Sequence, residues 1–109
     1  MKKLLFVVVC IGIKLSMSGQ VLGVLKYDGG GDWYANPTAL DNLAAFYNEN
    51  LEGICIVQEE VSTSNLLQSG ISFLHATGHG RIYFDELDVQ NLRYFIERGG
   101  FLHIDDNYG

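Results

Sequence analysis

Short apolar segments alternate with amphipathic segments along most of the chain. Apolar runs at residues 21–27, 54–57, 71–76 and 101–104 have the length of buried strands, and glycine or polar residues bound them. Between the first and second runs, and again between the third and fourth, apolar residues recur at helical spacing. Strands that are apolar on both faces and alternate with such helices predict an α/β protein with a doubly wound, flavodoxin-like parallel sheet.

The two predicted helices begin with different signals. Asn36 is interpreted as the N-cap of the first helix, with Pro37 at the first helical position, where a missing N–H costs nothing. Asp85 is interpreted as the N-cap of the second helix, and Asp88 stands three residues later in the register of a capping box. The second helix is expected to stop at Gly99, because helices often end in glycine. The apolar stripes comprise Leu40, Leu43, Ala44, Phe46 and Tyr47 in the first helix, and Leu87, Leu92, Phe95 and Ile96 in the second.

The beginning of the chain has the order of a secretory signal peptide. Lys2 and Lys3 precede the apolar run 4–13, and small or polar residues follow it. The run is about half of the roughly 20 residues that a membrane-spanning helix needs. We therefore expect a signal peptide at residues 1–19, cleaved near its last residue, and the front part of one domain at 20–109. The protein is expected to be periplasmic or extracellular and to contact a membrane only during export.

The two cysteines carry different expectations. Cys10 lies inside the apolar run, and a lipoprotein would need a small residue immediately before an acylated cysteine, where Val9 stands instead. Lipid anchoring is therefore the minor alternative to cleavage. Cys55 is the single cysteine left after cleavage, so no intramolecular disulfide can form. Its apolar neighbours predict a buried strand residue rather than a nucleophile.

Removal of the signal peptide leaves a strongly acidic chain. Three of the seven basic residues belong to the predicted signal, which leaves four against thirteen carboxylates, and 4 − 13 gives a net charge of −9. No cluster of Lys and Arg is present to bind phosphates, which excludes nucleic acid as an expected partner. Anionic membrane surfaces are disfavoured for the same reason. The expected partner is a small molecule or another envelope protein.

Three segments resemble a single bacterial family. They are residues 25–37 (LKYDGGGDWYANP), 77–80 (TGHG) and 99–109 (GGFLHIDDNYG). They are similar to the domain of unknown function 4159 family of exported and membrane-associated proteins, and the resemblance covers nearly everything after the predicted signal. It implies a class I glutamine amidotransferase-like fold, which agrees with the order of strands and helices. It implies no established activity.

The predicted fourth strand lies at the very end of the sequence. No helix follows to cover its far side, and about 90 mature residues would leave a hydrophobic sheet edge exposed. We therefore expect a domain that is incomplete at its C-terminus. The resemblance implies the same, because family members usually continue well beyond the residues that match 107–109.

Polar and glycine-rich segments follow three of the predicted strands. In a doubly wound sheet, ligands bind at the carboxyl ends of the strands. The segments 28–32, 77–80 and 105–107 are therefore expected at one edge of the sheet and predict a binding site there, although glycine-rich turns are also what the fold itself requires. The candidate ligand-binding residues are Asp28, Gly29, Gly30, Gly31, Asp32, Trp33, His79, Asp105, Asp106 and Asn107.

The triglycine at 29–31 precedes a helix, as phosphate-binding loops do. It matches neither the dinucleotide fingerprint nor the Walker pattern, and no lysine follows it. Asp28 and Asp32 flank it and would repel an anion. We interpret the triglycine as a structural turn, with Trp33 and Tyr34 either packing under it or presenting an aromatic face to a ligand.

An amidotransferase mechanism lacks its nucleophile in this chain. The resemblance implies a cysteine at a sharp turn after the strand that matches 101–104, but Asp105 and Asp106 stand there. Neither a Gly-x-Cys-x-Gly nor a Gly-x-Ser-x-Gly elbow occurs in the sequence. We therefore favour a non-catalytic ligand- or partner-binding module of the cell envelope that uses no cofactor.

A metal-dependent hydrolase is the alternative function. The metal candidates are His79, His103 and Asp105, because imidazole and carboxylate groups at neighbouring strand ends suit a divalent transition metal that activates water. His75 and Asp106 belong to the same neighbourhood. His75 and His103 are each flanked by apolar residues, so the ordinary interpretation of both is a hydrogen-bonded core histidine.

Overall fold

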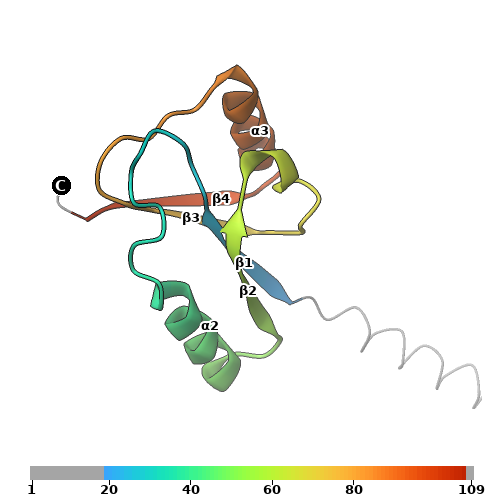
Figure 1. Cartoon of the computed structure of the whole chain (residues 1–109). Helices are drawn as coiled ribbons and strands as arrows, with labels where there is room; N and C mark the ends of the chain where they lie inside the picture. Colours follow the sequence, from blue (N-terminus) through green and yellow to red (C-terminus); the bar gives the residue numbers. More distant parts are fainter. Residues whose placement is uncertain (1–18, 108–109) are drawn as a thin grey trace, which may run out of the picture.

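The computed structural model describes residues 19–107, which include almost all of the predicted domain. The predicted signal peptide lies outside the described residues apart from its last position. Within the described range, no helix combines the length and the apolar character needed to cross a membrane. The elements are β1 (Gln20–Leu25), α2 (Ala39–Asn50), β2 (Cys55–Val61), the 3-10 helix η1 (Thr63–Asn65), β3 (Phe73–Gly78), α3 (Glu86–Glu97) and β4 (Phe101–Asp106) (Figure 1).

The four strands form a parallel sheet in the order β2-β1-β3-β4. This confirms the predicted α/β class with a parallel sheet, and the strand order is consistent with a flavodoxin-like fold. Across the sheet, β2 is added on one side of β1, whereas β4 is added on the opposite side, next to β3. Since such crossovers are right-handed, α2 and α3 lie on opposite faces of the sheet, as Figure 1 shows.

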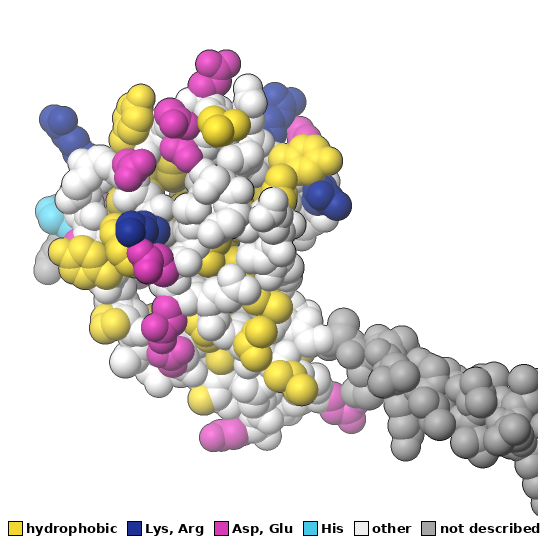
Figure 2. Space-filling view, turned by 45° about the vertical axis from the view of Figure 1, so that its right-hand side comes forward, with side chains coloured by type: hydrophobic (Ala, Val, Ile, Leu, Met, Phe, Trp, Pro, Cys, Tyr) yellow, Lys and Arg dark blue, Asp and Glu magenta, His cyan; other side chains and the backbone are white. Residues whose placement is uncertain are grey.

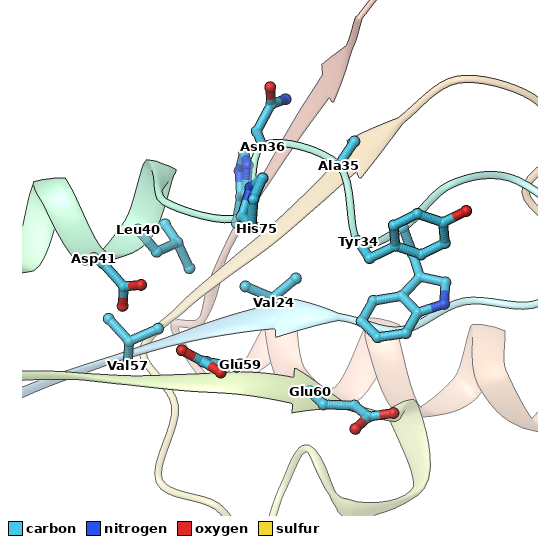
Figure 3. Close-up of a pocket in the computed structure, with 12 residues that line it drawn as sticks. Val24, Tyr34, Ala35, Asn36, Leu40, Asp41, Val57, Glu59, Glu60 and His75 are labelled. Atoms are coloured by element: carbon cyan, nitrogen blue, oxygen red, sulfur yellow. The ribbon is translucent and has the colours of Figure 1, made fainter.

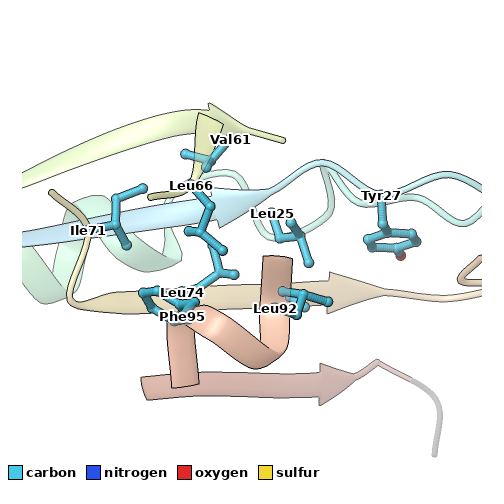
Figure 4. Packing of buried hydrophobic residues seen from close by; sticks show 9 residues of the cluster. Leu25, Tyr27, Val61, Leu66, Ile71, Leu74, Leu92 and Phe95 are labelled. Atoms are coloured by element: carbon cyan, nitrogen blue, oxygen red, sulfur yellow. The ribbon is translucent and has the colours of Figure 1, made fainter. Parts of the chain in front are cut away.

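Each face of the sheet has its own hydrophobic core. Leu74 of β3 is fully buried on the α3 face, where it packs with Leu92 and Phe95 of α3 (Figure 4). On the α2 face, Leu22 of β1 packs with Leu40 of α2. The two cores follow from the alternation of side chains along each strand, which sends successive residues to opposite faces. The sheet is therefore covered on both sides over β1 and β3.

Helix α3 begins as the sequence predicts. The Asp85 carboxylate accepts a hydrogen bond from the Asp88 N–H at 2.7 Å, and the Asp88 carboxylate accepts one from the Asp85 N–H at 3.0 Å. This reciprocal pair is the predicted capping box. The Thr63 hydroxyl also donates to the Asp88 carboxylate, so the same side chain connects η1 to α3.

Helix α2 begins later than the sequence predicts. Its N-cap is Thr38 and its first residue is Ala39, so the prediction of Asn36 as N-cap with Pro37 at the first helical position was wrong. The physical reason is the backbone of Asn36, whose φ of 55° lies in the left-handed region rather than in the extended region of a helix cap. The Asn36 side chain makes long-range hydrogen bonds instead, which are described below.

Three strands extend beyond their predicted ends. Pairing with β1 carries β2 as far as Val61, whereas the apolar run stops at Val57. Pairing between β3 and β4 matches Thr77 with Asp105 and Gly78 with Asp106. Backbone hydrogen bonding to a neighbouring strand therefore overrides the polar composition of these strand ends.

Strand β4 is the most exposed strand of the sheet. Phe101 and Ile104 are 58% and 60% exposed, on opposite faces of an edge that no further strand covers within residues 19–107. His103 is exposed as well. The interpretation of His103 as a core histidine was therefore wrong, because β4 lies at the edge of the sheet. The same interpretation of His75 as a core histidine is confirmed, since β3 is a central strand and His75 is buried.

Candidate ligand-binding site

The carboxyl ends of the parallel strands form one edge of the sheet, which we call the carboxyl edge. The loop after β1 folds across this edge towards the end of β3. The Asp32 carboxylate accepts a hydrogen bond from the backbone N–H of His79, and the Asp32 N–H donates to the His79 carbonyl at 3.1 Å. Asp32 therefore holds the loop against the turn that follows β3.

Gly78 allows this close approach of the loop. Its φ is 137°, which side chains rarely tolerate, and a Cβ at this position would lie 2.7 Å from the Asp32 carbonyl oxygen. Tyr27 packs beside it and donates its hydroxyl hydrogen to the Thr77 carbonyl at 3.0 Å. Burial, and then the carboxylates of Asp32 and Asp106, raise the pKa of Tyr27, so its hydroxyl stays protonated as a donor.

Asn36 ties the same loop to two strands. Its Nδ2 atom donates to Thr77 Oγ1 at 2.9 Å and to Asn107 Oδ1 at 2.7 Å. The Asn107 N–H in turn donates to the Gly78 carbonyl at 3.1 Å. The loop after β1, the end of β3 and the end of β4 are thus joined by one hydrogen-bond network at the carboxyl edge.

The triglycine turn uses its backbone within the protein. The Gly31 N–H donates to the Arg81 carbonyl at 2.9 Å, and the Tyr83 N–H donates to the Asp28 carbonyl at 2.7 Å. Asp28 and Tyr83 also form an isolated antiparallel bridge. The segment after β3 therefore pairs with the triglycine loop, and this pairing supports its interpretation as a structural turn.

A cavity of about 300 Å³ lies between this loop, the start of α2 and the α2 face of the sheet. We call it the Trp33 cavity. In Figure 3, Val24 of β1 lies between Tyr34 at one end and Asp41 at the other. The residues that give the cavity its chemical character are Trp33, Tyr34, Asn36, Asp41, Glu59, Glu60 and His75.

His75 lines the Trp33 cavity from the central strand β3 and is only 6% exposed. Its Nδ1 atom lies 2.9 Å from His103 Nδ1, and the two rings are stacked with centroids 5.1 Å apart. Its Nε2 atom is buried and has no hydrogen-bond partner among the described residues. Burial, and then the neighbouring His103, lower the pKa of His75, which therefore lines the cavity as a neutral imidazole at pH 7.

Trp33 and Tyr34 form an aromatic corner of the cavity. Their ring centroids are 5.7 Å apart and their planes are nearly perpendicular, at 86°. The Lys26 ammonium lies 5.4 Å from the centre of the Trp33 ring and 2.7 Å from the Glu60 carboxylate. The hydrogen bond to Glu60, together with its charge, raises the pKa of Lys26. The chain thus places one of its own cations against the aromatic corner.

The structure places the predicted site residues at the carboxyl edge but divides them between two roles. Trp33 alone among them lines the Trp33 cavity. Asp32 and Asn107 hold the loop and the strand ends together, as described above. The remainder of the predicted set lies at the same edge and outside the lining of this cavity: Asp28, Gly29, Gly30, Gly31, His79, Asp105 and Asp106.

The metal candidates do not converge within the described part of the chain. Among residues 19–107, no group of three or more His, Cys, Asp and Glu side chains is arranged to hold a metal ion. His103 and Asp105 stand two positions apart on β4, and His79 follows the end of β3. This geometry lends no support to a metal-dependent hydrolase.

Sequence reasoning missed most of the cavity lining. The sequence predicts His75 as a core residue, and its burial agrees with this. The sequence does not indicate that His75 lines a cavity with an Nε2 atom that has no partner among the described residues. Glu59 and Glu60 were assigned to the segment after the second strand, although the carboxyl-end rule would have included them had β2 been given its full length. Asp41 carried no signal, because an acidic residue in the first turn of a helix is ordinary.

The comparisons with known proteins identify a family and nothing closer. No curated protein and no solved structure gives a significant match to the chain. Residues 21–109 match the family described as domain of unknown function (DUF4159), and this match spans most of the sequence. The chain therefore belongs to the DUF4159 family.

Proposed function

We propose that this chain is a non-catalytic binding module of the bacterial cell envelope, and that it takes a small molecule into the Trp33 cavity. The observation that carries the proposal is a 300 Å³ cavity with an aromatic corner and a buried imidazole nitrogen that has no partner among the described residues. Small-molecule sites are typically about 300–1,000 Å³, with apolar and aromatic walls and a few polar groups that fix orientation.

The buried Nε2 atom of His75 favours a ligand over an empty hollow. A buried polar atom left without a hydrogen bond costs about 1–3 kcal/mol, and most such atoms in folded proteins have a partner. A ligand that offers a hydrogen-bonding group at the inner wall would provide that partner. The bound ligand would then make both an apolar contact with Trp33 and a hydrogen bond with His75.

The non-catalytic part of the proposal rests on Cys55 and on the residues at the end of β4. Cys55 is buried in β2, and burial raises the pKa of its thiol, which makes it a poor nucleophile. The place where the sequence resemblance implies a nucleophile is occupied by Asp105 and Asp106, the last two residues of β4. No cofactor is part of the proposal.

Location and the finer fold class belong to the same proposal. We propose that residues 1–19 direct export and that the domain works in the periplasm or outside the cell, as the order of basic, apolar and small residues suggests. We also propose a class I glutamine amidotransferase-like fold. The strand order of the parallel sheet supports it.

The sole tryptophan makes the proposal directly testable, because Trp33 lines the cavity. The full chain is screened against amines, sugars, amino acids and nucleotides, with Trp33 fluorescence and thermal unfolding as readouts. A ligand at one hundred times its Kd stabilises a protein by about 2.7 kcal/mol, which corresponds to roughly 10–20 °C in Tm for a domain of this size. We expect at least one compound to shift both readouts.

Two matched variants show whether the ligand binds in the Trp33 cavity. Ala35 lines the cavity, whereas Ala39 is exposed at the start of α2 and does not. Ala35→Leu fills part of the space and is expected to abolish the fluorescence shift and the gain in Tm, while Ala39→Leu leaves both unchanged. If both variants bind the ligand equally well, the binding site lies outside the cavity. If no compound binds at about 1 mM, the proposed function is contradicted.

A further inference from the structure

We infer that the Trp33 cavity selects an organic cation, a small molecule that carries a primary or quaternary ammonium group. The inference rests on the proposed function, since it names the ligand class of the same cavity. Two carboxylates without partners, an aromatic corner and a neutral inner wall together carry it.

The carboxylates give the cavity its charge. Asp41 and Glu59 line it, and the carboxylate of neither makes a hydrogen bond or an ion pair with any other described residue. Glu60 also lines it, but the Lys26 ammonium compensates its charge. The cavity therefore holds an excess of two negative charges, which attract a cation and repel an anion.

The aromatic corner is suited to the same ligand class. The faces of Trp and Tyr rings carry negative partial charge and attract ammonium groups within about 6 Å of the ring centre. Lys26 already makes such a contact with Trp33 at 5.4 Å. Because the half-exposed Lys26 ammonium contacts both Trp33 and Glu60, it shows that this corner accepts a cation.

The inner wall carries no opposing charge. His75 is neutral at pH 7, so Asp41 and Glu59 face no imidazolium across the cavity. When His75 Nδ1 donates to His103 Nδ1, the Nε2 atom of His75 is left as a hydrogen-bond acceptor. An N–H or O–H group of the bound cation would satisfy this acceptor.

The surroundings reinforce the attraction. The described residues include four basic and thirteen acidic side chains, and acidic side chains run down one side of the face shown in Figure 2. A strongly negative protein raises the local concentration of small cations near its surface. A neutral sugar could also stack on Trp33 and bond to the carboxylates, so the test has to separate charge from shape.

Three cations are compared with neutral molecules of matched shape by titration calorimetry on the full chain. The pairs are choline with 3,3-dimethylbutan-1-ol, ethanolamine with ethylene glycol, and putrescine with butane-1,4-diol. We expect at least one cation to bind about tenfold more tightly than its neutral counterpart and to weaken as salt is added. Equal affinity within every pair overturns the inference and leaves the proposed binding function standing.

Charge-neutral variants locate the effect in the cavity. The double variant Asp41→Asn with Glu59→Gln keeps the shape of the lining and is expected to weaken the best cation about tenfold. Glu52→Gln, an exposed carboxylate outside the cavity lining, serves as the control and should leave the affinity unchanged. Unaltered affinity in the double variant overturns the inference.

Lys26→Met is expected to raise the affinity for the cation, which would not happen if Lys26 had only a structural role. It removes the ammonium that pairs with Glu60, a carboxylate of the cavity lining, so the affinity for the cation should rise about threefold. A loss of cation affinity in this variant, with the fold intact by circular dichroism, counts against the inference. If no cation binds while another compound of the wider screen shifts Trp33 fluorescence, only the inference fails; if no compound binds at all, the proposed function fails with it.

Discussion

His75 and His103 share a hydrogen bond between their Nδ1 atoms, which lie 2.9 Å apart on neighbouring strands. The bond requires a proton on one Nδ1 and a free lone pair on the other, so it is lost when both rings are protonated. His75 is buried and His103 is exposed. The pair therefore connects a titratable surface group with the inner wall of the Trp33 cavity.

This pair predicts a loss of stability in mild acid. The pKa of His75 is lowered in the folded state, first by burial and then by His103, whereas an unfolded histidine titrates near pH 6.5. Above that pH both states leave His75 neutral. As the pH falls below it, the unfolded chain takes up a proton that folded His75 resists, so the free energy of unfolding decreases until the pH passes the folded-state pKa.

The measurement is the Tm of the full chain between about pH 8 and pH 5, around the ordinary histidine pKa. Wild type should lose stability over this range, and His75→Gln should lose much less, because the resisting group is gone. An unchanged pH dependence in His75→Gln would show that another group controls the effect.

Gly78 is predicted to be the least replaceable residue of the carboxyl edge. In Gly78→Ala, the new Cβ would lie 2.7 Å from the Asp32 carbonyl oxygen and 2.9 Å from Asp32 Oδ1, at a φ of 137°. Backbone strain and overpacking together should lower the free energy of unfolding by at least about 2 kcal/mol. Denaturant unfolding measures the change.

Gly70→Ala is the matched control for the steric part of this effect. Gly70 also has a positive φ, of 71°, but no atom lies within 4 Å of a Cβ built there. Its substitution should cost about 1 kcal/mol, from the backbone conformation alone. Equal losses in the two variants would mean that the contact of Gly78 with Asp32 adds nothing.

Local signals were sufficient to predict α3. Its N-cap, its capping box and its apolar stripe all lie within one short segment, and Asp85 and Asp88 bond to each other over three residues. The parallel sheet was predictable for a similar reason, since apolar strands that alternate with helices leave few arrangements. The placement of three polar segments at one edge then follows from the parallel direction of the strands.

The start of α2 and the Trp33 cavity were not predictable from local signals. The partners of Asn36 lie 41 and 71 residues further along the chain, and they hold it in a backbone conformation that its sequence neighbours do not suggest. His75 became a cavity residue only because β3 is central and the loop after β1 folds over it. Such contacts depend on strand pairing between distant segments, which one sequence does not specify.

The capping box of α3 is predicted to stabilise the folded protein while the carboxylate of Asp88 is charged. In Asp88→Ala, the Asp85 N–H and the Thr63 hydroxyl both lose their acceptor. The free energy of unfolding should fall by about 1–2 kcal/mol at pH 7. Glu86→Ala removes a first-turn carboxylate outside the capping box and should cost only a few tenths of a kcal/mol.

The difference between wild type and Asp88→Ala should narrow in acid. The hydrogen bond from Thr63, followed by those from Asp85, lowers the pKa of Asp88. Its stabilising effect is therefore complete above the ordinary aspartate pKa of about 3.9 and is lost as the pH falls through the lower folded-state value. Urea unfolding at pH 7 and pH 3 compares the two proteins, and a constant difference would contradict the role given to the charged carboxylate.

Asn36 is predicted to control the position of Trp33, because it ties their shared loop to β3 and β4 through Thr77 and Asn107. Asn36→Gly keeps the left-handed backbone accessible and removes both side-chain bonds. Since the two bonds are at most partly buried, the loss should be about 1 kcal/mol in total, at the lower end of the range for hydrogen bonds. Asn36→Ala should lose about 1 kcal/mol more, because alanine disfavours a φ of 55°.

Trp33 emission provides the second measurement for these variants. Loosening of the loop would expose the half-buried indole, so Asn36→Gly should shift its emission to longer wavelength and weaken any ligand of the Trp33 cavity. Asn107→Ala removes only one of the two bonds and should show a smaller shift in the same direction. If Asn36→Gly matches wild type in emission and stability, the loop is held by Asp32 and its contact with His79 instead.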